Sequence, residues 1–425
     1  MASDAASFFE SFFRELGKRG IPFAILHDYE RLPDQMPSDI DFAVRREDLP
    51  KLLPLQRAIA RHQGWVLASV VHAKLSAQYA VFFDPMDASR FIQLDACGHY
   101  VERGCLVLRD TQLLHDCRTY RFFHIPPPAT EFAYLLAKTL IKNKPLAPCL
   151  PRLRKLWATD PAGADDRFRQ LVGDSDGPLR EWFARPATEW EQALRPRIRA
   201  RTRFGPVNLA RECARACRRV LQPVGLHIVI LGPDGVGKST LIAQLRLPCF
   251  QRMTQFHFRP GLLGKKPAGV ITQPHAQPPR SRLSSLAKTL YYFADHWLGY
   301  LGKIFPAKVR RELVVFDRSF EDVLVDPRRY RLSAGSGFAR FLKRLLPPPD
   351  LTFVLDAEPE LVHARKPELG IAELRRQREF LRQLASRTPR CVIISAAETP
   401  AQVARTVQRQ MIVFLAEREK QRQGF

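Results

Sequence analysis

The stretch of this chain best suited to chemistry is a glycine-rich loop that runs from Gly232 to Thr240. Its text, GPDGVGKST, has Gly232, four further residues, and then Gly237, Lys238 and Ser239, which is the spacing G-x-x-x-x-G-K-[ST]. Glycines at these places let successive backbone N–H groups turn inward around an anion, and a following helix adds the positive end of its dipole. The loop, including Gly235 and Val236, therefore predicts phosphate binding.

Three side chains of this loop predict separate tasks. Lys238 is expected to reach the β- and γ-phosphates of a nucleotide, and the Ser239 hydroxyl to hold Mg²⁺. Asp234 is an acid in a loop built for anions, so we expect its carboxylate to bind something useful, such as a substrate hydroxyl. A loop tip that points into solvent is the alternative. The motif does not name the reaction, because ATPases, GTPases and kinases share it.

A second candidate group follows the apolar run VVFD, which ends at Asp317. At the C-terminal edge of a parallel sheet this carboxylate would lie near the phosphate loop, where it could hold Mg²⁺ or orient an attacking oxygen. Arg318 comes next and could bind the phosphate of an acceptor. Acids at strand ends are common in such sheets, so a structural role is the alternative.

A third candidate is the arginine-rich stretch 363–384, HARKPELGIAELRRQREFLRQL. Arg365 and Arg376 in this stretch could belong to a mobile lid that neutralises charge on a phosphoryl group in transfer. The alternative is a basic helix face exposed to solvent.

Three acids near the N-terminus form another pattern. The text SDIDFAV places Asp39 and Asp41 two apart on an expected strand, so both side chains should face the same way. Asp95 follows on a later strand, in FIQLDAC. Paired carboxylates with a third nearby predict a two-metal site of the kind used for nucleotidyl transfer.

The elements that must position these residues separate into three regions. Residues 1–125 mix a helical start with short strands and predict a small α/β domain, whereas 126–222 is helical and increasingly basic. From 223 to 425, strands and helices alternate, which predicts a parallel sheet covered on both faces. The expected strands are 22–28, 40–46, 65–71, 77–83 and 90–96 in the first region, and 226–232, 254–258, 312–317, 351–356 and 391–395 in the third.

Composition limits the partners and the compartment. The formal net charge is +24, which predicts attraction to polyanions, and nine arginines against one acid lie between Arg195 and Arg219. This basic connector could contact nucleic acid or an anionic surface, or could pair with acids elsewhere. Eight scattered cysteines without a CxxC pair predict reduced thiols. The N-terminal residues do not resemble a signal peptide, and the apolar stretch 286–305 is interrupted by Asp295 and His296, so a cytoplasmic protein is expected.

Residues 225–418 resemble the thymidylate kinase family of nucleoside monophosphate kinases. The likeness is carried by the phosphate loop, the Asp-Arg pair after the third strand, PDLTFVLDAEPE at 349–360, and the arginine-rich stretch. It implies a P-loop fold with a doubly wound, five-stranded parallel sheet, and transfer of the ATP γ-phosphate to a phosphorylated or hydroxyl acceptor. The resemblance implies that Lys238, Ser239 and Thr240 serve ATP and Mg²⁺. It also implies that Asp317 and Arg318 lie at the reacting centre and that Asp234 touches the sugar of the acceptor.

Two departures from the family fall on the acceptor side. Where members read F-x-R-E-P, this chain reads FHFRPG at 256–261, which keeps Arg259 and lacks the glutamate. Where members read A-A-D-R, it reads FADHW at 293–297, with His296 in the place of the arginine that holds the monophosphate. Arg259 and His296 are nevertheless the expected substrate residues, and the acceptor stays open between thymidylate and a sugar or glycan intermediate.

The N-terminal region resembles the nucleotidyltransferase superfamily in its pattern D-h-D-h followed by h-D-h. The resemblance implies metal binding by Asp39, Asp41 and Asp95. His27 and Asp28 stand where the superfamily normally has Gly-Ser. A catalytic transferase and a degenerate domain that recognises substrate or ATP both fit this pattern.

The leading prediction is thus an ATP- and Mg²⁺-dependent kinase with a nucleotidyltransferase-like domain attached through a basic helical connector. A nucleotidyltransferase centred on the N-terminal carboxylates is one alternative. An ATP-switched module that binds nucleic acid or an anionic surface is the other. The sequence leaves the oligomeric state open, a homodimer included.

Overall fold

A computed structural model of the chain describes residues 5–71, 76–102, 105–173, 177–201, 206–264, 278–333 and 336–423. Backbone contacts divide the chain into two compact units. The first comprises Met1–Arg218 with Leu415–Phe425, and the second comprises Arg219–Phe414. Within the ranges described, no helix combines the length and the apolar character that crossing a membrane requires.

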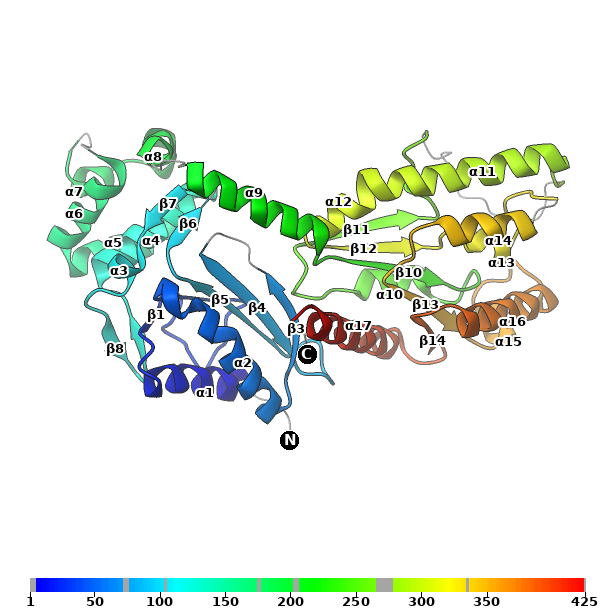
Figure 1. The fold of residues 1–425 in the computed structure, drawn as a ribbon, viewed down its shortest axis with the longest axis horizontal. Coiled ribbons are helices and arrows are strands. Elements are labelled where there is room, and N and C mark those ends of the chain that lie inside the picture. Colours follow the sequence, from blue (N-terminus) through cyan, green and yellow to red (C-terminus); the bar gives the residue numbers. More distant parts are fainter. Residues whose placement is uncertain are drawn as a thin grey trace. The chain divides into compact units, whose positions relative to one another are not determined.

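The first unit is built on a mixed five-stranded sheet of order β1-β2-β5-β4-β3 (Figure 1). Strand β2 runs parallel to β5, and the other neighbours pair antiparallel. The five strands are β1 (Phe23–Ile25), β2 (Ile40–Val44), β3 (Val66–Val71), β4 (Ala77–Phe83) and β5 (Phe91–Cys97). All five expected strands of this region are present, and β1 is shorter than expected.

Helix α1 (Ala5–Lys18) buries the phenylalanines that the sequence places at helical spacing, among them Phe8, Phe12 and Phe13. These rings share one hydrophobic core with residues of the sheet and of helix α2 (Leu49–Gln63). The apolar face of α1 therefore anchors the start of the domain.

The rest of the first unit is mostly helical. Two short hairpins, which the sequence did not indicate, lie within residues 100–125, before the longer helices. They are β6 (Tyr100–Glu102) with β7 (Cys105–Leu108), and β8 (Arg118–Tyr120) with β9 (Phe123–Ile125). The helices are α3 (Asp110–Leu113), α4 (Pro128–Ile141), α5 (Leu150–Thr159), α6 (Pro161–Val172), α7 (Leu179–Trp182), α8 (Ala187–Arg201) and α9 (Pro206–Leu221), with the short 3₁₀ turns η1 (Arg46–Asp48) and η2 (Ala147–Cys149). A second core, which includes Trp182 and Trp190, joins α4–α8 to the sheet. Part of the basic connector, residues 202–205, lies outside the described residues.

The second unit contains a five-stranded sheet whose pairings are all parallel, in the order β11-β12-β10-β13-β14. Its strands are β10 (Leu226–Leu231), β11 (Arg252–His257), β12 (Glu312–Asp317), β13 (Leu351–Asp356) and β14 (Cys391–Ser395). The expected doubly wound parallel sheet is confirmed. Because β12 lies next to β10, Asp317 is brought level with Ile230, two residues before the phosphate loop.

Helices lie on both sides of this sheet (Figure 1). They are α10 (Lys238–Gln244), α11 (Arg282–Gly299), the π-helical turn η3 (Tyr300–Ile304), α12 (Phe305–Val309), α13 (Asp322–Val325), α14 (Ser336–Leu345), α15 (Pro359–Arg365), α16 (Ile371–Arg387) and α17 (Pro400–Arg422). One core joins sheet residues such as Val229 and Phe316 to Ala307 of α12 and Leu381 of α16.

Candidate functional site

The phosphate loop joins β10 to α10. Gly235 and Gly237 adopt φ values of 86° and 107°, in the left-handed region that side chains other than glycine rarely occupy. A Cβ atom on Gly235 would also lie 2.8 Å from Cβ of Lys366. Both glycines are therefore required by the shape of the loop, as the sequence pattern predicts.

Lys238 is buried at the start of α10. Its Nζ atom donates hydrogen bonds of 2.8 Å to the carbonyl oxygens of Gly232 and Pro233. Burial, and then the charge of Arg318, lower the pKa of Lys238 to about 8. Ser239 and Thr240 follow and are exposed to solvent. The ammonium thus lies against the backbone of the loop that it is expected to serve.

Asp317 ends β12 in a setting that suits a cation. Burial opposes its ionisation, but the hydrogen bond from His257 and the charge of Lys238 hold the pKa of Asp317 below its usual range. His257 Nδ1 lies 3.4 Å from Oδ2, and the buried Oδ1 has no hydrogen-bond partner among the described residues. An ionised oxygen left unpartnered is the donor that Mg²⁺ prefers, so Asp317 and the Ser239 hydroxyl fit a Mg²⁺ ion.

Two arginines converge on Asp234 in the phosphate loop. Arg318 and Arg329 each donate to one of its carboxylate oxygens. Arg318 also donates to Asp322 over 2.8 Å, and Asp322 accepts at 2.8 Å from the hydroxyl of Tyr330. Burial opposes ionisation of Asp234, but the charges of Arg318 and Lys238 hold its pKa well below the usual range. The network therefore keeps the Asp234 carboxylate and the Arg318 guanidinium charged beside the loop.

The sequence indicated Arg318 but not Arg329. Arg318 follows a strand end, which marks it as a residue at the sheet edge. Arg329 reaches the loop from residues after α13, and the spacing of the sequence does not reveal that return. His257 was missed for a similar reason, because its position depends on the pairing of β11 with β12.

Arg259 lies next to an anchored loop. Its guanidinium donates to the Tyr291 hydroxyl over 2.6 Å and lies 3.8 Å from the Asp295 carboxylate. Asp295 in turn accepts three backbone N–H groups, those of Gly261, Leu262 and Leu263, at 2.7–2.9 Å. Asp295 therefore fixes the backbone that follows Arg259.

An aromatic cluster connects Arg259 to the Arg318 network. The rings of Phe258 and Tyr330 stack at 4.4 Å, and Tyr292 meets both edge-on at 5.0 and 5.8 Å. The guanidinium of Arg259 lies 6.0 Å from the centre of the Tyr292 ring, and Tyr330 bonds Asp322, the partner of Arg318. These side chains are buried and pack on one another, so they form a small aromatic core that joins Arg259 to the Arg318 network.

His296 does not occupy a substrate position, contrary to the expectation from the sequence. Its side chain is buried, and its ring nitrogens lie 2.8 Å from the carbonyl oxygen of Tyr292 and 2.9 Å from that of Phe258. Burial lowers the pKa of His296, so the ring is neutral. Its single N–H then donates to one of the two carbonyl oxygens. A ring held by backbone carbonyls cannot replace the arginine of the family pattern.

The two arginines of the expected lid have different surroundings. Arg365 donates to the Ala396 carbonyl over 3.2 Å and, with residues of the phosphate loop, lines a cavity of about 290 Å³. Arg376 instead donates to Glu373 at 2.6 and 2.8 Å and to the carbonyl of Val325 at 2.8 Å. Arg365 thus adjoins the phosphate loop, whereas these bonds hold Arg376 on the surface of α16.

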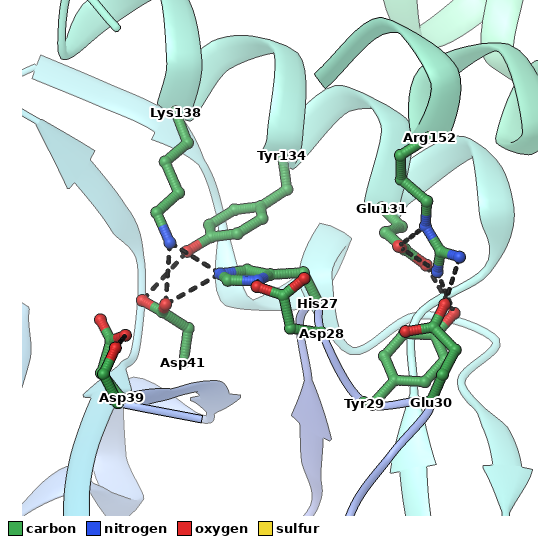
Figure 2. A network of polar contacts seen from close by, with 11 residues as sticks. His27, Asp28, Tyr29, Glu30, Asp39, Asp41, Glu131, Tyr134, Lys138 and Arg152 are labelled. Carbon is green, nitrogen blue, oxygen red and sulfur yellow. Dashed lines mark hydrogen bonds and ion pairs between the residues drawn. The ribbon is translucent and has the colours of Figure 1, made fainter. Parts of the chain in front are cut away.

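In the first unit, Asp41 lies at the centre of a buried cluster (Figure 2). Its carboxylate accepts from His27 Nε2 and from Lys138 Nζ, each at 2.8 Å, and from the Tyr134 hydroxyl at 3.3 Å. The other nitrogen of His27 lies 2.6 Å from the carboxylate of Asp28. The sequence pointed to Asp41 but not to Lys138 and Tyr134, which come from α4.

Charge is balanced within this cluster. Burial disfavours a protonated ring, but the hydrogen bonds to Asp28 and Asp41 raise the pKa of His27 to about 9. Burial likewise opposes ionisation of Asp41, yet His27 and Lys138 hold its pKa well below the usual range. His27 and Lys138 therefore balance the two carboxylates of the cluster, Asp28 and the buried Asp41.

The expected two-metal site is not formed by these acids. Among the described residues, no group of three or more His, Cys, Asp and Glu side chains is placed to hold a metal ion. Strand β2 begins at Ile40, so Asp39 lies before it, exposed and bonded to the Ser38 hydroxyl at 3.0 Å. Asp95 lies opposite Asp41 on β5, but the ammonium of Lys138 takes the side of Asp41 where a cation would bind.

Comparison with known proteins assigns the second unit. A family model described as thymidylate kinase matches residues 230–412. A probable thymidylate kinase of Pyrobaculum aerophilum is 30% identical over 164 residues, which cover 37% of this chain and 78% of that protein. A thymidylate kinase of Bacillus cereus is 31% identical over 150 residues, covering 33% of this chain and 69% of the relative.

Two further matches extend over nearly the whole of the matched protein. A probable thymidylate kinase of Methanosarcina acetivorans is 28% identical over 207 residues, covering 45% of this chain and 97% of the relative. The crystal structure of a thymidylate kinase from Ehrlichia chaffeensis matches with a TM-score of 0.29 and 18% identity, covering 43% of this chain and 95% of that one. Taken with the family match, the curated relatives show that the chain is an ATP- and Mg²⁺-dependent kinase and belongs to the thymidylate kinase family.

Proposed function

We propose that this kinase transfers the γ-phosphate of ATP to the phosphate of a nucleoside monophosphate. The observation that carries the proposal is the convergence of Arg318 and Arg329 on Asp234, inside the phosphate loop. Planar guanidinium groups match the oxygens of a phosphate better than those of a neutral sugar hydroxyl. Two of them beside the donor loop favour an acceptor that is already phosphorylated.

An aromatic ring beside Arg259 supports a nucleoside as the rest of the acceptor. Tyr291, whose hydroxyl accepts a hydrogen bond from Arg259, is 36% exposed. A base can stack on its face, while a glycan offers less planar surface to it. The relatives carry the name thymidylate kinase, so thymidylate is the first acceptor to test.

On the donor side, the residues of the phosphate loop have consistent tasks. Lys238 holds the charge that develops on the phosphoryl group in transfer, and its burial strengthens that interaction. Mg²⁺ held by Ser239 and Asp317 would neutralise the donor phosphates. The cavity lined by Gly235, Thr240 and Arg365 has room for part of the donor nucleoside. In-line attack needs the acceptor phosphate beside the γ-phosphate, opposite the leaving group, and we assign Arg318 and Arg329 to hold it there.

The experiment is a measurement of ADP release by the purified full chain with ATP and Mg²⁺. The acceptors are thymidylate, the other nucleoside monophosphates, a panel of sugars and sugar phosphates, and water alone. We expect one or more nucleoside monophosphates to accelerate ADP release, and Lys238→Ala to reduce that rate by about a hundredfold or more. Acceleration by a sugar or sugar phosphate alone would show that the acceptor is assigned wrongly.

A further inference from the structure

The second unit contains a cavity separate from the phosphate loop. It has a volume of about 420 Å³, which is within the range of small-molecule sites. Its wall is formed by residues from η3, the segment after β12, the end of α14 and the segment after α16. No residue of the loop 232–240 contributes to the wall. His227 lies at the beginning of β10, and the phosphate loop follows the end of that strand.

His227 is the unexplained side chain of this cavity. It is 6% exposed and lines the cavity, and neither ring nitrogen has a hydrogen-bond partner among the described residues. Burial lowers the pKa of His227 to about 4, so the ring is neutral and offers one N–H donor and one nitrogen acceptor. Buried polar groups are normally paired, and an unpaired one in a cavity wall indicates a ligand that pairs it.

The surfaces around His227 are aromatic. Its ring centre lies 5.2 Å from that of Phe316, which lies 6.3 Å from that of His296. Tyr300 also lines the cavity. Aromatic surfaces of this kind favour a planar ring over a flexible polar chain.

The opening of the cavity carries more positive than negative charge. Lys343, Arg344 and Arg390 line it, against one acid, Glu321, which lies 3.6 Å from the Lys343 ammonium. Pairing with Lys343 compensates Glu321, so two guanidinium groups give the opening a net positive charge. An anionic group on the ligand would be attracted there.

We propose that this cavity is a second ligand site, which takes a planar heterocycle with ring N–H and C=O groups and an attached anionic group. An N–H or C=O group of such a ring would pair one nitrogen of His227 while the ring packs against the aromatic wall that includes Tyr300. The anion would lie toward Arg344 and Arg390. Ser319 and Glu321 in the wall lie one and three residues after Arg318. A ligand in the cavity would therefore contact the segment that also carries Arg318 of the kinase site. The site goes beyond the proposed phosphoryl transfer and does not depend on it.

The test is calorimetric titration of the full chain with three matched probes. Orotate has the ring amides and a carboxylate, uracil has the ring without the anion, and benzoate has the anion on a ring without amides. We expect orotate to bind at least about tenfold more tightly than uracil or benzoate. Uridine monophosphate, as a fourth probe, carries a phosphate on a ribose in place of the carboxylate. Because it is also a candidate acceptor of the kinase, its binding supports the site only where His227→Phe weakens it.

Variants locate the binding. His227→Phe keeps an aromatic ring but removes both nitrogens, and we expect it to weaken orotate binding about tenfold or more. Arg344→Gln should weaken it severalfold, whereas Arg340→Gln, on the same helix but outside the cavity wall, should not. Lys238→Ala and Arg329→Gln, which change the donor and acceptor sides of the kinase site, should leave it unchanged. Thermal unfolding establishes that each variant is folded.

The proposal is overturned if neither orotate nor uridine monophosphate binds the wild-type chain. It is also overturned if binding persists in His227→Phe and is lost in Lys238→Ala or Arg329→Gln, because the ligand would then occupy the kinase site. Since the readout is binding, an inactive kinase would leave this result unaffected.

Discussion

At the scale of single residues, Arg365 and Arg376 provide a matched pair within one arginine-rich stretch. Arg365 adjoins the phosphate loop, and Arg376 is held by Glu373 on α16. We expect Arg365→Gln to raise the KM for ATP by about threefold to tenfold, because a charge near the donor is lost. Arg376→Gln should change it by less than about twofold. Steady-state kinetics at varied ATP check this, and equal effects of the two variants would refute the assignment.

Residues whose task follows from their neighbours in the chain could be predicted from the sequence. The phosphate loop is the clearest example, since its glycines, Lys238 and Ser239 act within nine positions. Arg329 and His257 could not be predicted, because each reaches its partner only through the folding of distant segments. His296 was assigned wrongly because alignment with the family pattern cannot reveal that backbone carbonyls surround its ring.

At the scale of elements, Lys138 ties helix α4 to strand β2 through Asp41. Lys138→Met would leave the buried Asp41 carboxylate with one cation fewer, and we expect the free energy of unfolding to fall by about 3–5 kcal/mol. Lys155→Met, at an exposed position on α5, should cost less than about 1 kcal/mol. Denaturant unfolding of both variants makes the comparison.

Adding Asp41→Asn to Lys138→Met should restore part of the lost stability, because it removes the uncompensated charge. Equal stability of Lys138→Met and Lys155→Met would mean that the ion pair between Lys138 and Asp41 does not stabilise the folded protein.

The strands of both sheets were predictable because their apolar runs are distinct, and the parallel sheet followed from strand and helix alternation. The two hairpins of the first unit were not, since each of their strands has three or four residues. The order of the strands also depends on contacts between segments that are distant in sequence. The predicted domain boundaries near residues 125 and 222 stay predictions.

At the scale of the whole molecule, His27 gives the first unit a specific dependence on pH. Its pKa is raised from 6.5 to about 9 in the folded protein. The native state therefore binds the extra proton more tightly, and its contribution is fully present below pH 6.5 and is lost as pH rises through about 9. We expect the free energy of unfolding to fall by about 3 kcal/mol at most across this window.

Denaturant unfolding at each pH can be followed by tryptophan fluorescence, because four of the five tryptophans (65, 157, 182 and 190) belong to the first unit. His27→Gln should flatten the decrease between pH 6.5 and 9. A decrease of the same size in the variant would assign the pH dependence to other groups.

The most direct test of the central claim is the KM for the nucleoside monophosphate acceptor in Arg329→Gln, compared with Arg328→Gln. Arg329 bonds Asp234 in the phosphate loop, whereas its neighbour Arg328 is exposed. We predict that Arg329→Gln raises the acceptor KM about tenfold or more at saturating ATP, and that Arg328→Gln leaves it within about twofold of the wild type. An unchanged acceptor KM in Arg329→Gln would contradict the proposal that Arg318 and Arg329 hold the acceptor phosphate.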